Sequence, residues 1–359
     1  MLSVEPSLDL AMIGNCSCAA LIDKAARIVW WCLPRFDGDP VFHSLLGTRG
    51  EEGDGSFAIE LPGTVRCEQQ YIENTAVVRT RLFDEAGNAI EITDFAPRFE
   101  RAGRMFRPTA IVRRVRPISG HPRIRVRCRP RMAHGERVPD ITFGSNHIRY
   151  VGNGTTVRMT TNASVTYVRN ETPFFLDGPM SFHLGPDESL TDHPEKLCRE
   201  FEEETIRYWK LWTRRLGLPL EYQQAVIRAA ITLKLCTYEE TGAIIAAATT
   251  SIPEAAGTER NWDYRYTWLR DSAFTVFALE RLGFRPTPPG YHGAAMGTEN
   301  VTIVLPDGMT YFEVLAVREP TDRNEDKRAA LGARGHHLFG LAIKGEAHEL
   351  YDLIEALGA

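Results

Sequence analysis

The pattern of apolar and polar positions divides the chain into a first part typical of strands and a second part typical of helices. Turn residues between short apolar runs predict strands at 19–23, 27–33, 76–83, 89–94 and 110–115. Glu85-Ala86-Gly87-Asn88 joins two of these runs as a hairpin turn, because Gly and Asn accept a positive φ. Many short strands with close turns predict an antiparallel β-sandwich, which we assign to residues 1–190.

Helical spacing replaces this pattern near Asp187. A helix is predicted at 194–212, within a linker at 191–218. The next is predicted at 222–239, where apolar residues spaced three and four apart form a stripe of Val226, Ala229, Ala230, Leu233 and Cys236.

A third helix is predicted at about 266–282, with Gly283 as its C-terminal cap. The run Arg-Pro-Thr-Pro-Pro-Gly at 285–290 is a stiff break typical of linkers, and we treat 285–359 as a small α+β tail. The tail pattern predicts two strands around a turn and an amphipathic helix, at 301–305, 312–317 and 346–357.

Composition excludes disorder and membrane-spanning helices. Apolar residues make up 43% and charged residues 25% of the chain, and no charge-free apolar run of 20 residues occurs. The net charge of −5 gives no overall basic field for nucleic acid. The stretch 98–131 is rich in arginine, but alternation such as Arg123-Ile-Arg-Val-Arg-Cys-Arg129 predicts a strand with one solvated face.

The seven cysteines lie in apolar contexts that are typical of buried, reduced thiols. Cys16-Ser17-Cys18 has no second pair or histidine at zinc spacing, so no metal site is predicted. Residues 1–9 carry two acids and no base, unlike a secretory leader. We therefore expect a cytoplasmic protein without metal or other cofactor.

Two groups of segments carry a family pattern. The first is Ile-Gly-Asn-Cys-Ser-Cys-Ala-Ala-Leu-Ile-Asp at 13–23 with Trp-Trp-Cys-Leu-Pro-Arg-Phe-Asp at 30–37. The second comprises residues 233–254 and then Arg-Asn-Trp-Asp-Tyr-Arg-Tyr-Thr-Trp-Leu-Arg-Asp at 260–271. In order and spacing these segments resemble bacterial glycoside hydrolases of family 15, the glucoamylase and trehalase-like enzymes, over about residues 8–284.

The resemblance implies that the sandwich is followed by the first helices of an (α/α)6 barrel, at 219–284, and that the substrate is an α-glucoside or α-glucan. It assigns contacts with a glucosyl unit to Tyr264, Trp268, Arg270 and Asp271. Their chemistry fits, because Asp accepts and Arg donates hydrogen bonds to sugar hydroxyls while aromatic rings cover apolar C–H faces. On spacing alone, a surface ion pair and core aromatic residues would be the alternative.

The catalytic residues stay unassigned. Inverting glycosidases use two carboxyl groups roughly 6.5 to 9.5 Å apart, and family 15 supplies them from later barrel segments. The tail is too short for ten more helices of about 11 residues each. Nearby acids such as Glu254 and Glu259 are interpreted as surface loop residues, and Glu313 and Glu319 lack a matching context.

The sequence therefore predicts a glycoside hydrolase of glucoamylase or trehalase type, which releases glucose by inversion, in a truncated or fused chain that is inactive alone. A non-catalytic carbohydrate-binding or interaction module is the alternative. A third possibility is that the tail completes a different enzyme, with a metal at 322–327, where a solvated turn is the simpler interpretation. The particular α-glucoside stays open, and a homo-oligomer is possible.

Limited proteolysis tests the predicted organisation. Barrel helices without their neighbours would leave Val226, Leu233, Phe274 and Phe277 short of apolar partners. We expect residues 1–200 to outlast the remainder of the chain when fragments are followed by mass spectrometry. Equal rates of degradation for both parts would contradict this organisation.

Overall fold

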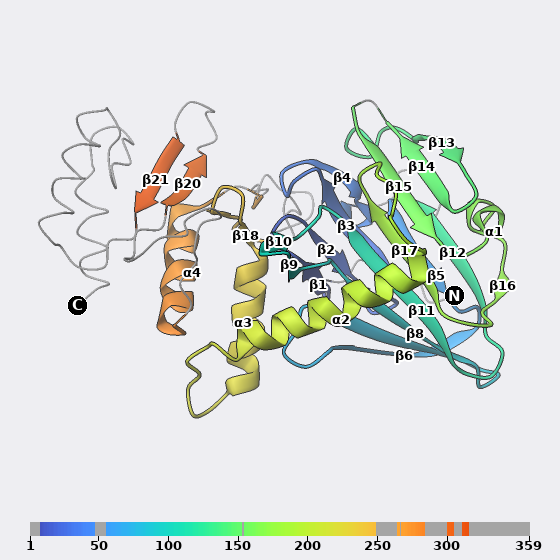
Figure 1. Ribbon diagram of the computed structural model, residues 1–359, viewed down its shortest axis with the longest axis horizontal. Coiled ribbons are helices and arrows are strands. Elements are labelled where there is room, and N and C mark those ends of the chain that lie inside the picture. Colours follow the sequence, from blue (N-terminus) through green and yellow to red (C-terminus); the bar gives the residue numbers. More distant parts are fainter. Residues whose placement is uncertain are drawn as a thin grey trace, which may run out of the picture.

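Two antiparallel sheets form the N-terminal part of the computed structural model, which describes residues 8–46, 55–152, 154–248, 264–265, 267–283, 300–304 and 311–315 (Figure 1). The first sheet has the order β1 (Ala11–Gly14), β2 (Ala19–Ile22), β3 (Ile28–Leu33), β5 (Ser56–Glu60), β12 (Arg123–Arg129) and β16 (Phe174–Phe175), with β4 (Asp39–Phe42) paired to β3. The second has the order β13 (Asp140–Phe143), β14 (His147–Val151), β15 (Thr156–Thr161), β17 (Met180–Gly185), β11 (Ile111–Ser119), β8 (Ala89–Phe95), β7 (Val78–Asp84) and β6 (Thr64–Tyr71).

The core between the sheets takes alternate side chains from each strand. In β3 all six residues are buried, because consecutive side chains point to opposite faces and both faces are covered. Trp31 packs into the core between the sheets, where it stacks on Phe42 at a ring-centroid distance of 5.9 Å. Trp30 points the other way, into a second core shared with the helices. The predicted sandwich is therefore confirmed, with strand ends within three or four residues of expectation.

Arg113 of β11 differs most from the prediction that the arginines of residues 98–131 lie on a solvated face. Its side chain is fully buried and donates from Nε to Asp94 Oδ1 of β8 at 2.7 Å. Nη1 donates to the carbonyl of Phe57 in β5 at 2.5 Å, and Nη2 donates to the carbonyl of Ala26. One guanidinium thus joins the second sheet to the first. The arginines of β12 behave as predicted, since they form partly exposed ion pairs with Glu60 and Glu171.

Helix α2 (Pro194–Thr213) confirms the helix predicted at 194–212 and packs on the outer face of the second sheet. Leu197, Cys198 and Phe201 form a third core there with Phe95 and Val112. The C-terminal end of α2 contributes Trp209 and Trp212 to the core behind β3. Within the described residues, none of the helices is long and apolar enough to cross a membrane.

Helix α3 (Gln223–Leu235) ends four residues before the predicted boundary, because Thr237 and Tyr238 form strand β18, which pairs with β19 (Ala243–Ile244). The predicted stripe is confirmed only in part, because Ala230 and Cys236 are buried as expected. Val226 and Leu233 are only partly buried, and Ala229 is exposed. The buried face is formed by Ile227, Ala230, Ile231, Lys234 and Leu235. The sequence pattern did not predict this face, because it includes the charged residue Lys234.

Helix α4 (Leu269–Arg281) lies beside α3 and begins three residues after the predicted start, because Trp268 is extended with φ −96° and ψ 127°. The predicted cap is confirmed, since Gly283 has φ +73° and its N–H donates to the carbonyl of Glu280 at 2.8 Å. Two tail strands are found one or two residues earlier than predicted, as the antiparallel pair β20 (Asn300–Val304) and β21 (Tyr311–Leu315). The predicted helix at 346–357 lies outside the described residues, and the barrel stays a prediction.

Asp94→Asn tests the buried cross-link between the sheets. The substitution leaves the Arg113 cation buried without its counter-charge, so we expect the free energy of unfolding to fall by about 3–5 kcal/mol in urea titrations. Glu68→Gln is the control, because Glu68 pairs with Arg66 at the surface, where such pairs contribute less than about 1 kcal/mol. Equal losses in the two variants would contradict the role of this pair.

Candidate functional site

Two of the predicted sugar contacts come together at the start of α4. The rings of Tyr264 and Trp268 lie 6.3 Å apart between centroids, with an angle of 33° between their planes. Tyr264 is half-buried, whereas Trp268 is 37% exposed and so keeps ring surface available to a ligand. Paired aromatic faces of this kind cover the apolar faces of a pyranose ring.

The two charged residues of the motif lie in the first turn of α4. Asp271 is half-buried and follows Trp268, the residue before the helix, by three positions. A carboxylate in this turn also interacts favourably with the helix dipole. Arg270 belongs to the same turn, but its side chain lies outside the described part of the chain.

The hairpin of β18 and β19 supports the backbone of Tyr264. Strand β19 ends at Ile244. Shortly after it, Ala246 and Ala247 donate their N–H groups to the main-chain carbonyl of Tyr264 at 3.0 and 3.2 Å. The Ile245 N–H donates to the carbonyl of Cys236, at the end of α3, at 3.0 Å. The position of Tyr264 therefore follows that of the hairpin.

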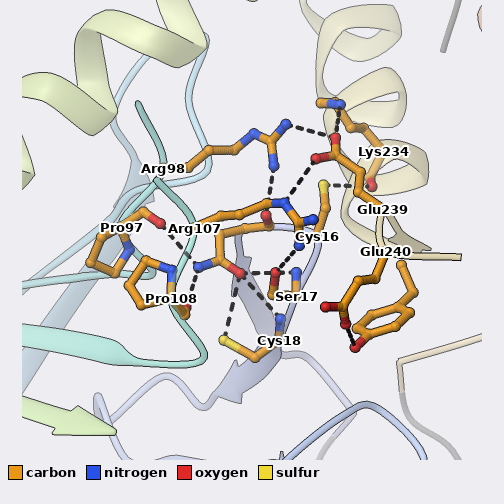
Figure 2. Close-up of polar contacts among 12 residues, drawn as sticks. Cys16, Ser17, Cys18, Pro97, Arg98, Arg107, Pro108, Lys234, Glu239 and Glu240 are labelled. Carbon is orange, nitrogen blue, oxygen red and sulfur yellow. Dashed lines mark hydrogen bonds and ion pairs between the residues drawn. The ribbon is translucent and has the colours of Figure 1, made fainter. Parts of the chain in front are cut away.

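An ion network fixes the hairpin to the sandwich (Figure 2). Glu239 follows β18, and its Oε1 accepts from Arg98 Nη2 at 2.6 Å and from Lys234 Nζ at 2.8 Å. Its Oε2 lies 3.5 Å from Nε of Arg107. The side chains of Arg98 and Lys234 are 2% and 5% exposed, so two buried cations share this one carboxylate as their counter-charge. Both arginines belong to the sandwich part, whereas Lys234 belongs to α3.

The loop between β1 and β2 forms the sandwich side of this junction. Asn15 Nδ2 donates to the carbonyls of Pro97 and Pro108, and Asn15 Oδ1 accepts from the N–H groups of Ser17 and Cys18. The loop contacts the helical part directly, because the Cys16 carbonyl accepts from the Glu239 N–H at 3.0 Å. Residues Asn15 to Cys18, between β1 and β2, therefore form a loop that docks on the helical part, which we call the docking loop.

The electrostatics of the junction favour a permanently ionised carboxylate. Burial would raise the pKa of Glu239, but Lys234 and Arg98 outweigh burial and lower it to about 2. Burial raises the pKa of the Cys16 thiol, which donates from Sγ to the Lys234 carbonyl at 3.2 Å. Glu239 therefore holds its neighbours at neutral pH and does not supply a proton.

The sequence pattern did not predict this junction. The segment of Asn15 and Cys16 stands out only as part of the family pattern, and Arg98 belongs to the arginine-rich stretch that was expected to be solvated. One available signal was Lys234, a lysine three and four residues after Ile231 and Ala230 on an apolar face. A buried lysine requires a counter-charge, which the sequence offers five residues later at Glu239.

Two shallow cavities lie away from the aromatic pair. One of about 350 Å³ lies over β6 and β7 and is lined by Glu68, Gln69, Gln70, Arg79 and Arg81. The other, of about 230 Å³, lies between the β6–β7 connection and α3. Neither is lined by Tyr264, Trp268 or Asp271, so the candidate sugar site depends on the motif and its geometry.

Comparison with protein families assigns both parts of the chain. Residues 4–169 match the family described as trehalase-like, N-terminal, and residues 221–349 match glycosyl hydrolases family 15. The second match extends past residue 284, into the region that the sequence pattern set apart as a tail.

Curated relatives carry the name trehalase. The chain is 31% identical to the trehalase of Thermoplasma volcanium over 76% of its own length and 44% of that protein. It is 30% identical to the trehalase of Thermoplasma acidophilum, over 74% and 46% of the two lengths. For the trehalase of Mycolicibacterium smegmatis the identity is 28%, over 77% and 45%. The chain spans a little under half of the length of these relatives.

Replacing Glu239 with Gln tests the ion network through pH. The pKa of Glu239 is depressed from 4.5 to about 2, so its stabilisation is complete above about pH 4.5 and is lost as the pH falls to about 2. At pH 7 the free energy of unfolding of the variant should be about 3 kcal/mol lower than that of the wild type. This difference should shrink as the pH falls from about 5 to about 2. Urea titrations followed by tryptophan fluorescence measure it. A difference that does not change with pH would contradict the assignment.

Proposed function

We propose that this chain, with its trehalase-like N-terminal region and its family 15 glycosyl hydrolase region, recognises a glucosyl unit of an α-glucoside for inverting hydrolysis. The family and the name of the relatives support a glycosidase. The observation that carries the proposal is the aromatic pair Tyr264–Trp268 at the start of a helix whose first turn contains Arg270 and Asp271.

These side chains divide the recognition of a sugar between them. Tyr264 and Trp268 would cover the apolar C–H face of the pyranose ring. The Asp271 carboxylate would accept hydrogen bonds from hydroxyl groups, and the Arg270 guanidinium would donate to them. Trehalose, maltose and longer α-glucans all present such a unit, and the name shared by the relatives favours trehalose.

Catalysis requires a protonated carboxyl and a second carboxylate, and we assign neither here. Glu239 is not the acid, because its pKa of about 2 and its buried cationic partners keep it ionised. We therefore propose that the chain binds the sugar and shows little or no turnover by itself. The same observation favours the second candidate, a carbohydrate-binding module without catalysis.

Association of two or more copies is part of the proposal. Phe274 and Phe277 of α4 are 54% and 41% exposed, whereas Leu233 is partly buried against the helical core. Exposed phenylalanines one turn apart form an apolar surface that a second copy would cover.

Asp271→Ala tests the sugar site. A lost hydrogen bond to a charged group costs about 1.5–3 kcal/mol, so the dissociation constant for trehalose or maltose should rise roughly 10- to 100-fold. Quenching of tryptophan fluorescence or calorimetry measures binding, and glucose release from trehalose, maltose and starch measures turnover.

Glu280→Ala is the matched control for Asp271→Ala, because Glu280 is exposed in the last turn of the same helix. It should bind sugar as the wild type does. Equal affinity in both variants would remove Asp271 from the site. Glucose release that depends on Asp271 would show that the chain obtains its acid and base after all.

A further inference from the structure

We propose that Glu239 is a positioning residue through which the N-terminal sandwich sets the place of the sugar-binding segment. This inference extends the proposed function, since the segment is the one that begins at Tyr264. It is based on a continuous series of contacts from the sandwich to that residue. Each step is a hydrogen bond or ion pair between described residues.

The first step joins the sandwich to the hairpin. Arg98 is held by the sandwich and by α2, because its Nη1 donates to the Asn15 main-chain carbonyl at 2.7 Å and its main-chain N–H donates to Thr205 Oγ1 of α2 at 3.1 Å. Its Nη2 then donates to Glu239 Oε1 at 2.6 Å. The Glu239 main chain is fixed to the same loop, through its N–H bond to the Cys16 carbonyl.

The second step runs from the hairpin to the sugar-binding segment. Glu239 directly follows β18, whose Thr237 and Tyr238 pair with Ile244 and Ala243 of β19. Two and three residues after β19, Ala246 and Ala247 donate their N–H groups to the Tyr264 main-chain carbonyl. A shift of the hairpin away from the sandwich would therefore displace the ring of Tyr264 relative to Trp268.

The carboxylate charge is the essential property of Glu239. Lys234 and Arg98 bring two buried cations to one oxygen atom, and without an anion between them they would repel each other. A neutral glutamine keeps the size of the side chain but leaves this repulsion in place. The expected result is that the end of α3 and the hairpin move away from the docking loop.

Glu91 supplies a matched control within the same chain. It is 2% exposed and ion-pairs with three arginines, Arg79, Arg81 and Arg116, but it lies on β8 and none of these partners belongs to the hairpin. Glu91→Gln and Glu239→Gln thus each remove one carboxylate that pairs with several cations, although the arginine partners of Glu91 are 30–56% exposed. Only the second variant breaks the series of contacts that leads to Tyr264.

Hydrogen exchange of the full-length chain measures the position of the hairpin without any ligand. In Glu239→Gln the amides of Ala246 and Ala247 should exchange at least about tenfold faster than in the wild type, while Glu91→Gln should leave them unchanged. Glu239→Asp, which keeps the charge, should recover part of the protection. Faster exchange in both glutamine variants, or equal loss in Glu239→Asp and Glu239→Gln, would overturn the proposal.

Sugar binding provides the second measurement, with trehalose and maltose as probes. Glu239→Gln should raise the dissociation constant about tenfold or more, and Glu91→Gln should leave it unchanged. Unchanged affinity in Glu239→Gln would overturn the positioning role. If the wild-type chain binds neither sugar, the proposed function fails, while the exchange rates still decide whether Glu239 positions the segment.

Discussion

The guanidinium of Arg113 is the polar group on which the frame of this protein depends. It lies in the core between two sheets and satisfies acceptors on both, the Asp94 carboxylate in one and the Phe57 carbonyl in the other. A buried cation tolerates little displacement, because each lost acceptor leaves a charge without a partner. The two sheets are therefore joined by buried hydrogen bonds as well as by packing.

That frame explains how a sandwich can influence a site on the helices. The docking loop at Asn15–Cys18 leaves the first sheet, and Arg98 lies between β8 and the short strand β9 (Phe99–Arg101). Both meet at Glu239, where a third and fourth charge, Lys234 and Arg107, complete the network. The same physical device, an arginine that bonds an acid and main-chain carbonyls, thus appears twice. It first joins sheet to sheet and then joins sandwich to helices.

The trehalase-like region and the family 15 region are matched by separate families, and in this chain ion pairs connect them. The proposed sugar-binding residues begin where the connection ends, at the backbone of Tyr264. In this view the sandwich contributes to recognition without touching the ligand, since orientation of aromatic and charged groups to within about an ångström determines affinity and rate.

Local chemistry let the sequence determine much of this protein. Alternation and turn residues gave the strands, the hairpin at Glu85–Asn88 and the cap at Gly283, because these depend only on neighbouring residues. The family motif at 260–271 identified Tyr264, Trp268 and Asp271 as candidate sugar contacts. Tertiary structure decided the rest: that Arg98, Arg113 and Lys234 are buried, and that α3 ends early to place Glu239 against the docking loop. Residues more than 80 positions apart supply the counter-charges and acceptors of Arg98, so no pattern along the chain could identify them.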